Sequence, residues 1–124
     1  MNVVDTSGWV EYFLNSHRAD LFALAIEQRD KLLVPVIALY EVHKILSRQM
    51  PPEAVEKFLD VMRLGRVLDL TDKRAIAAST VSRQHGLAMA DAAMYSMAQE
   101  FKATFWTQDA DYQALADVKF FAKD

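Results

Sequence analysis

The most constraining feature of this chain is an alternation between two patterns. Short apolar runs typical of β-strands alternate with longer stretches whose apolar residues recur every three or four positions. Residues 31–34 form a run of the first kind ended by a proline, and residues 36–49 form a stretch of the second kind. Strands separated by helices favour a mainly parallel sheet with helices on both faces. The sequence therefore predicts an α/β protein.

The same patterns divide the whole chain into predicted elements. Strands are expected at residues 2–4, 31–34, 66–70, 103–107 and 118–121. Helices are expected from a cap at Thr6 or Ser7 through residue 14, then over 18–29, 36–49, 51–65, 71–86, 90–101 and 109–115. No repeat or linker interrupts this order, so we expect one domain over residues 1–124. Ligands of such sheets bind beyond the carboxyl ends of the strands.

Composition narrows the class of protein further. Apolar residues make up 52% of the 124 residues, enough to bury a core, and the absence of cysteine excludes disulfide scaffolds and thiolate nucleophiles. No apolar run approaches the roughly 20 residues of a membrane span, and the first residues do not resemble a signal peptide. We therefore expect a cytoplasmic protein with no membrane partner.

Four carboxylates lie where a purely structural sequence would favour other residues. Asp5 directly follows the first expected strand, and Asp109 directly follows the fourth. Glu41 borders the apolar stripe of its helix, and Asp91 is the only charged residue between positions 86 and 99. A carboxylate against apolar surface is costly unless it is paired or bound to a cation. If the four acids converge, they offer the hard oxygen ligands that suit Mg²⁺ or Mn²⁺.

Each acid also has a structural interpretation. Asp5, Asp91 and Asp109 are acceptable helix N-caps, and Glu41 is placed to pair with Lys44 or Arg48, about one and two turns farther along its helix. The same two basic residues are alternatively candidates for contact with RNA phosphates.

Four segments together resemble a known family. They are Val-Val-Asp-Thr-Ser-Gly-Trp at residues 3–9, Pro-Val-Ile-Ala-Leu-Tyr-Glu-Val at 35–42, Leu-Ala-Met-Ala-Asp-Ala-Ala-Met at 87–94 and Phe-Trp-Thr-Gln-Asp-Ala-Asp-Tyr at 105–112. In this order and spacing they resemble the PIN domain, and more narrowly the toxin subunits of VapBC toxin–antitoxin pairs. The resemblance covers essentially the whole chain.

The resemblance implies a three-layer α/β/α fold and a metal-dependent endoribonuclease that hydrolyses RNA phosphodiester bonds with Mg²⁺, or Mn²⁺ in its place. It implies that the acids serve as catalytic and metal-binding residues, Asp5 and Asp91 most directly, with Glu41 and Asp109 completing the set. The flanking auxiliary positions are Thr6, Ser7, Thr107 and Asp111. The implied partners are an RNA substrate, an antitoxin that covers the active site, and a second copy of the chain in a homodimer.

The charge balance agrees with a localised acidic site. The chain has 14 Lys and Arg against 17 Asp and Glu, a formal net charge of −3, which is not typical of a protein that binds nucleic acid through bulk charge. Once the four candidate acids are set aside, 14 basic residues face 13 acidic ones. The remaining surface is therefore slightly basic.

Two other hypotheses fit part of the pattern. A phospho-acceptor receiver domain has a similar length and acids at strand ends, but it would use an acidic pair after the first strand, where this chain offers Asp5 alone. A catalytically silent protein of the PIN fold, acting only as a protein-binding module, is the second. Metal-dependent cleavage of RNA separates the nuclease from both.

Overall fold

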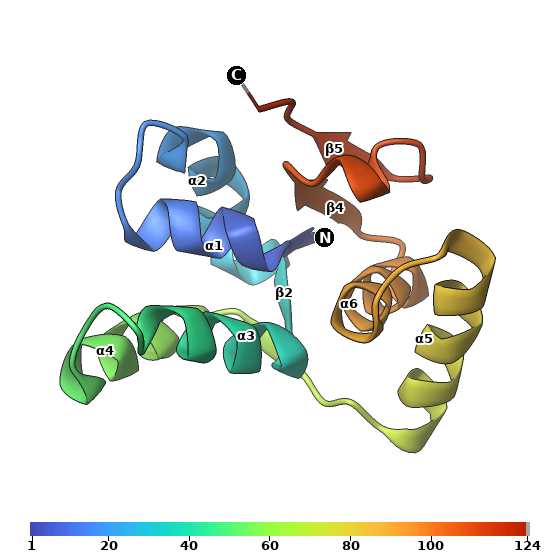
Figure 1. The fold of residues 1–124 in the computed structure, drawn as a ribbon, viewed down its shortest axis with the longest axis horizontal. Coiled ribbons are helices and arrows are strands. Elements are labelled where there is room, and N and C mark those ends of the chain that lie inside the picture. The colour runs from blue at the N-terminus through green and yellow to red at the C-terminus, as the bar shows by residue number, and fades with distance from the viewer. Residues whose placement is uncertain (124) are drawn as a thin grey trace.

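A computed structural model describes residues 1–123 and contains a five-stranded, entirely parallel sheet between layers of helices (Figure 1). The strands are β1 (Asn2–Val4), β2 (Leu32–Pro35), β3 (Arg66–Leu68), β4 (Thr104–Thr107) and β5 (Val118–Phe120), in the order β3-β2-β1-β4-β5. The helices are α1 (Thr6–Phe13), α2 (Ala19–Glu27), α3 (Val36–Leu46), α4 (Pro52–Met62), α5 (Asp72–His85) and α6 (Met89–Glu100), with short 3₁₀ turns η1 (Arg29–Lys31) and η2 (Ala110–Tyr112). The predicted α/β class and three-layer arrangement are confirmed.

The strand order explains how the helices are divided between the two faces. From β1 the chain steps to β2 and β3 on one side, then crosses back to β4 and β5 on the other side of β1. Because parallel crossovers are right-handed, α1 to α4 cover one face and α5 and α6 cover the opposite face, as Figure 1 shows. The direction of travel reverses between β1 and β4, so the carboxyl ends of these two strands form the crevice where ligands bind in such folds.

Helix α6 is the most enclosed helix of the fold. It packs against α5, α3 and strands β1, β2 and β4, and seven of its 12 residues are buried. Small side chains such as Ala92 and Ala98 allow this close approach on several sides, which is why the helix lacks one clear apolar face. Its first turn carries Asp91, so the position of this acid is set by a tightly packed element.

Helix α1 begins one residue earlier than the sequence predicted. The N-cap is Asp5, whose backbone is extended and whose carboxylate accepts a hydrogen bond from the Thr6 amide at 2.7 Å. Thr6 is the first helical residue, so the expectation that Thr6 or Ser7 caps this helix is wrong. Asp is a strong N-cap residue because its carboxylate satisfies an unpaired amide of the first turn.

The C-terminal third also differs in detail. The helix expected over residues 109–115 is only the 3₁₀ turn η2, because Asp109 binds the Asp111 amide and closes a local turn instead of extending a helix. Helix α6 begins at Met89 with Ala88 as its N-cap, so Asp91 is not the cap of that helix. None of the helices within residues 1–123 combines the length and apolar character needed to cross a membrane.

Candidate functional site

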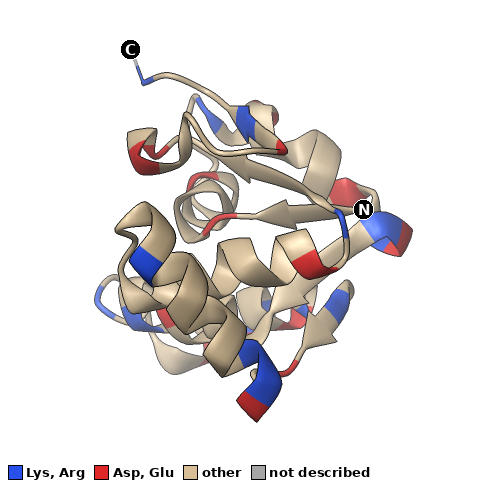
Figure 2. Cartoon of the chain, turned by 90° about the vertical axis from the view of Figure 1, so that its right-hand side faces the viewer, with Lys and Arg blue, Asp and Glu red and all other residues tan. Residues whose placement is uncertain are grey.

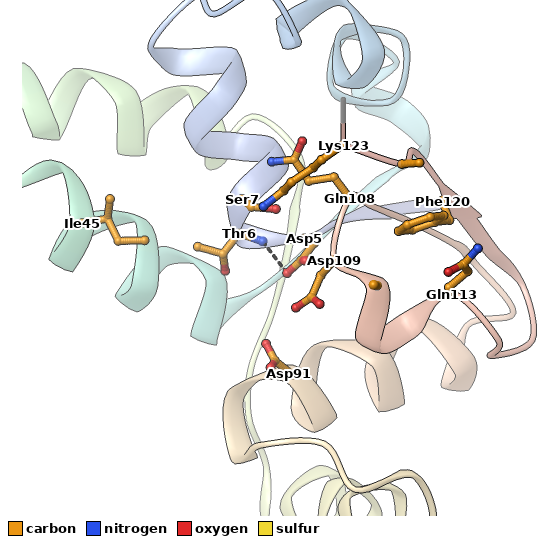
Figure 3. Close-up of a pocket in the computed structure, with 12 residues that line it drawn as sticks. Asp5, Thr6, Ser7, Ile45, Asp91, Gln108, Asp109, Gln113, Phe120 and Lys123 are labelled. Atoms are coloured by element: carbon orange, nitrogen blue, oxygen red, sulfur yellow. Dashed lines mark hydrogen bonds between the residues drawn. The ribbon is translucent and has the colours of Figure 1, made fainter.

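A pocket of about 710 Å³ opens at the carboxyl ends of β1 and β4, the crevice that the strand order creates (Figure 3). In Figure 3 the carboxylates of Asp5, Asp91 and Asp109 are directed toward one another from three different elements. The pocket is lined by Asp5, Thr6, Ser7, Ile45, Asp91, Gln108, Asp109, Ala110, Gln113, Phe120, Ala122 and Lys123. Three of the four predicted acids therefore share one pocket.

Asp5 is the most buried of these acids, with 4% of its surface exposed. Its two carboxylate oxygens accept hydrogen bonds from the Thr6 amide at 2.7 Å and from the Thr107 hydroxyl at 2.8 Å. Burial raises the pKa of Asp5 to about 7, the Thr107 hydrogen bond opposes this rise, and the charges of Asp91 and Asp109 add to it. Within residues 1–123 no Lys, Arg or His forms an ion pair with this carboxylate.

Asp91 lies in the first turn of α6 and is half-buried at the pocket. Burial raises the pKa of Asp91, and the charges of Glu41, Asp109 and Asp111 raise it further. The hydroxyl of Tyr112 lies close enough to the Asp91 carboxylate to offset part of that rise, although it does not form a hydrogen bond of good geometry. The raised pKa values of Asp5 and Asp91 both indicate negative charge that the protein leaves largely uncompensated.

Glu41 does not line the pocket but is hydrogen-bonded to Thr6, which does. It lies on α3 beside the pocket, and its carboxylate accepts a hydrogen bond of 2.6 Å from the Thr6 hydroxyl, whose oxygen is also 3.6 Å from the sulfur of Met94. The Thr6 hydroxyl therefore links the start of α1 to α3 by donating a hydrogen bond to one of the predicted acids. The alternative pairing of Glu41 with Lys44 or Arg48 does not occur among residues 1–123.

Thr107 connects two acids across the end of β4. Its hydroxyl donates to Asp5 at 2.8 Å and accepts from the Asp109 amide at 3.0 Å. Asp109 in turn accepts a hydrogen bond of 2.9 Å from the amide of Asp111, which is exposed and does not line the pocket. These contacts fix the backbone that presents Asp109.

The remaining predicted positions divide into two groups. Ser7 lines the pocket, and its hydroxyl oxygen is buried without a hydrogen-bond partner among the residues described. Lys44 on α3 and Arg48, two residues beyond the end of that helix, are exposed and do not line the pocket; the Lys44 ammonium lies 6.0 Å from the centroid of the Tyr40 ring. On the face drawn in Figure 2, basic and acidic residues are interspersed and no basic patch stands out.

The four acids come together without forming a closed set of ligands. Between residues 1 and 123, no three His, Asp or Glu side chains are arranged so that they could hold a metal ion. This differs from the compact acidic cluster that the sequence predicted. Both oxygens of Asp5 instead accept hydrogen bonds, from the Thr6 amide and the Thr107 hydroxyl.

Arg18, which the sequence did not single out, holds residues that line the pocket. Arg18 is buried and donates hydrogen bonds to the Gln108 side chain and to the carbonyls of Phe121 and Ala122, at 3.2 and 3.3 Å for the two carbonyls. These bonds hold the C-terminal segment at the edge of the pocket, where Lys123 extends over the site in Figure 3. They join residues about 90 to 100 positions apart, so no local sequence signal identifies them.

Comparison with protein families decides the classification. The family model described as the PIN domain matches residues 3–118, which is nearly the whole chain. The chain belongs to the PIN domain family. No curated protein matches this PIN domain by sequence. The resemblance inferred from the four motifs is confirmed, and family membership removes the receiver-domain hypothesis.

Solved structures share the fold of this PIN domain. A toxin–antitoxin complex from Klebsiella pneumoniae aligns with a TM-score of 0.82 at 14% identity, covering 96% of both chains. VapC20 of Mycobacterium tuberculosis, described as a toxin that cleaves the sarcin–ricin loop, aligns with a TM-score of 0.78 at 16% identity, covering 94% of this chain and 95% of that one. VapBC2 from Rickettsia felis, bound to a promoter DNA fragment, aligns with a TM-score of 0.71 at 16% identity, covering 97% and 96%.

Proposed function

We propose that this PIN domain is a metal-dependent endoribonuclease that hydrolyses RNA phosphodiester bonds. The observation that carries the proposal is the meeting of three carboxylates, Asp5, Asp91 and Asp109, in one pocket at the switch point of the sheet. Within residues 1–123 none of them has a cationic partner. Burying Asp5 without such a partner is costly, as its raised pKa shows, and a bound cation would offset that cost.

By the chemistry of its donors the pocket suits a hard divalent cation, although its carboxylates within residues 1–123 are not arranged as a set of metal ligands. Carboxylate oxygens are the ligands that Mg²⁺ and Mn²⁺ prefer, whereas softer metals favour the thiolate and imidazole groups that are absent from this pocket. Asp5 and Asp91 would hold the ion most directly, and Glu41 and Asp109 would bind it directly or through water. When bound, such an ion lowers the pKa of a water molecule and neutralises charge on the phosphate.

The other residues of the chain orient this set. Thr107 holds one oxygen of Asp5, and Thr6 holds Glu41. Ser7 lines the pocket, and its buried hydroxyl has no hydrogen-bond partner among the described residues. The exposed residues Lys44, on α3, and Arg48, just after it, would contact phosphates of the RNA away from the reacting group.

The proposed biological context is a toxin–antitoxin pair in the cytoplasm. The toxin–antitoxin complexes among the structural neighbours support this context, and the sarcin–ricin activity ascribed to VapC20 supports RNA as the substrate class. We expect an antitoxin to cover the pocket and to place an Arg or Lys side chain near Asp5 and Asp91, because a cation there compensates the buried negative charge. A homodimer is also expected, because the resemblance to VapBC toxins implies one.

The test is RNA cleavage by wild type and by Asp91→Asn. The two proteins are incubated with labelled transfer RNA and a sarcin–ricin hairpin, in Mg²⁺, in Mn²⁺ and in EDTA. Wild type should cleave only with metal, and Asp91→Asn should be at least about 100-fold slower, because Asn has the size of Asp but not its charge. Asp30→Asn, which changes an exposed acid away from the pocket, serves as the matched control and should retain wild-type activity.

Equal cleavage by the wild-type and Asp91→Asn proteins, or wild-type cleavage that persists in EDTA, would contradict the proposal. A folded wild-type protein that binds an antitoxin but cleaves no RNA under any of these conditions would instead support the protein-binding module.

A further inference from the structure

Lys123 is the one cationic side chain among the described residues that line the pocket. It is exposed, and in Figure 3 it extends over the pocket toward Ser7 from the segment that follows β5. The carboxylates of Asp5, Asp91 and Asp109 belong to the same pocket. A pocket whose charged groups are otherwise acidic therefore also holds one positive charge.

This lysine does not neutralise the acids beside it. Within residues 1–123, no ion pair joins the Lys123 ammonium to a carboxylate of the pocket or to any other carboxylate. A lysine that compensated the buried charge of Asp5 would lie within about 4 Å of one of its oxygens. The positive charge is therefore in a position to attract an anion that comes from outside the protein.

The backbone that carries Lys123 is held in place by contacts with three parts of the fold. The Phe121 amide donates a hydrogen bond of 2.9 Å to the carbonyl of Thr107, and the Phe121 ring packs edge-on against Phe22 at 5.4 Å between centroids. The buried guanidinium of Arg18 donates hydrogen bonds of 3.2 and 3.3 Å to the two carbonyls that precede Lys123. The position of Lys123 over the pocket is thus set by packed residues.

Ser7 offers a second donor in the same pocket. Its hydroxyl oxygen is buried and has no hydrogen-bond partner among the residues described. In the view of Figure 3, Lys123 and Ser7 lie on one side of Asp5, and Asp91 and Asp109 lie on the other. An ammonium and a hydroxyl both donate hydrogen bonds, and the oxygens of a phosphate accept them.

We propose that Lys123 binds a backbone phosphate of the RNA substrate in the pocket, on the side away from Asp91 and Asp109. This inference rests on the proposed function and names a residue that binds the substrate. An acidic pocket repels a phosphate, and a lysine acts on a phosphate as a compact point charge that offsets this repulsion. Phosphate contacts carry no base information, so the contact should strengthen the binding of different RNA sequences to a similar extent.

The first test measures RNA binding in EDTA, where the proposed nuclease does not cleave. Wild type, Lys123→Met and Lys123→Arg are titrated with labelled transfer RNA and with a labelled sarcin–ricin hairpin at several salt concentrations. Lys57→Met is the matched control, because Lys57 is exposed on α4 and does not line the pocket.

Lys123→Met should bind both RNAs about 3- to 10-fold more weakly than wild type at low salt. The slope of the logarithm of the binding constant against the logarithm of salt concentration should become shallower by about 0.7 to 0.9, the value for one phosphate contact. Lys123→Arg, which keeps the charge, and Lys57→Met should retain the wild-type slope.

The second test measures cleavage and metal binding in Mn²⁺. Lys123→Met should raise KM by about 3- to 10-fold and leave kcat within about threefold of wild type, because a contact made equally in the ground state and the transition state changes KM alone. Its Mn²⁺ affinity, measured by calorimetry on the full chain, should not be weaker than that of wild type, because an ammonium has no lone pair with which to bind a metal.

A wild-type salt slope in Lys123→Met, or an equal loss of slope in Lys57→Met, would overturn the inference. So would a Lys123→Arg protein that binds RNA as weakly as Lys123→Met, or weaker Mn²⁺ binding by Lys123→Met, which would show that the substitution disturbs the site. Absence of RNA binding by wild type would overturn it as well. If wild type binds RNA but does not cleave it, the proposed function fails, and the salt slopes in EDTA still decide whether Lys123 contacts a phosphate.

Discussion

Replacing Asp5 by Asn should remove a specific dependence of stability on pH. The Asp5 carboxyl is buried, and its pKa is raised to about 7 in the folded protein against 3.8 for an ordinary Asp. The folded state therefore binds this proton more tightly than the unfolded state does. As a consequence, the free energy of unfolding of the metal-free protein falls as the pH rises from about 4 to about 7.

The size of the effect follows from the two pKa values. Relative to low pH, where Asp5 is protonated in both the folded and unfolded states, the linkage relation lowers the free energy of unfolding of wild type by about 1.5 kcal/mol at pH 5 and by about 4 kcal/mol at pH 8. The two values differ by about 2.5 kcal/mol. Asn at position 5 does not titrate, so this difference disappears from the variant. Costs of the substitution that do not depend on pH, such as altered hydrogen bonding with Thr107, cancel when the two pH values are compared.

The assay is chemical denaturation of wild type and Asp5→Asn in EDTA at pH 5 and pH 8. The free energy of unfolding of Asp5→Asn minus that of wild type should be about 2.5 kcal/mol higher at pH 8 than at pH 5. Asp30→Asn, at an exposed position, controls for the change of residue type. If Asp5→Asn differs from wild type by the same amount at both pH values, Asp5 is not the buried, neutral-pH-titrating group that the structure describes.

Two further predictions concern stability. Gly8→Ala should destabilise the protein by about 1–2 kcal/mol in chemical denaturation, because a Cβ there would lie 2.6 Å from the Phe22 ring and 2.8 Å from Val4. This overpacking outweighs the better helix propensity of Ala. A variant more stable than wild type would refute the prediction. Asp91→Asn should be as stable as wild type or slightly more so in EDTA, because removing its charge relieves repulsion from Glu41 and Asp109, and a clear loss of stability would count against that repulsion.

Much of the fold was predictable because it depends on local patterns. Helix α5 illustrates this: Thr71 caps its start and Gly86, with φ of 68°, ends it in the left-handed conformation that glycine favours. The strand order depends on which strands pair across the sheet, and periodicity within single elements does not contain that information. After β4 a 3₁₀ turn replaces the expected helix, because the local hydrogen bond from the Asp111 amide to Asp109 competes with helix formation.

In the candidate site, too, local position was predictable from the sequence, whereas contacts between distant elements were not. The sequence predicts that Asp5 and Asp109 both lie at carboxyl ends of parallel strands, but their meeting in one pocket depends on β1 and β4 being neighbours in the sheet. The hydrogen bond between Thr6 and Glu41 joins residues 35 positions apart, so it depends on how α3 packs against α1.

The most direct test of the central claim is a crystal structure of the wild-type protein soaked in Mn²⁺, with the ion located by anomalous diffraction. The claim is that the carboxylates meeting between β1, β4 and α6 form a divalent-cation site. It predicts an anomalous peak bonded to carboxylate oxygens of Asp5 and Asp91, with Glu41 and Asp109 bonded directly or through water. No peak in the pocket at saturating Mn²⁺, or a peak only at another place on the protein, would contradict it.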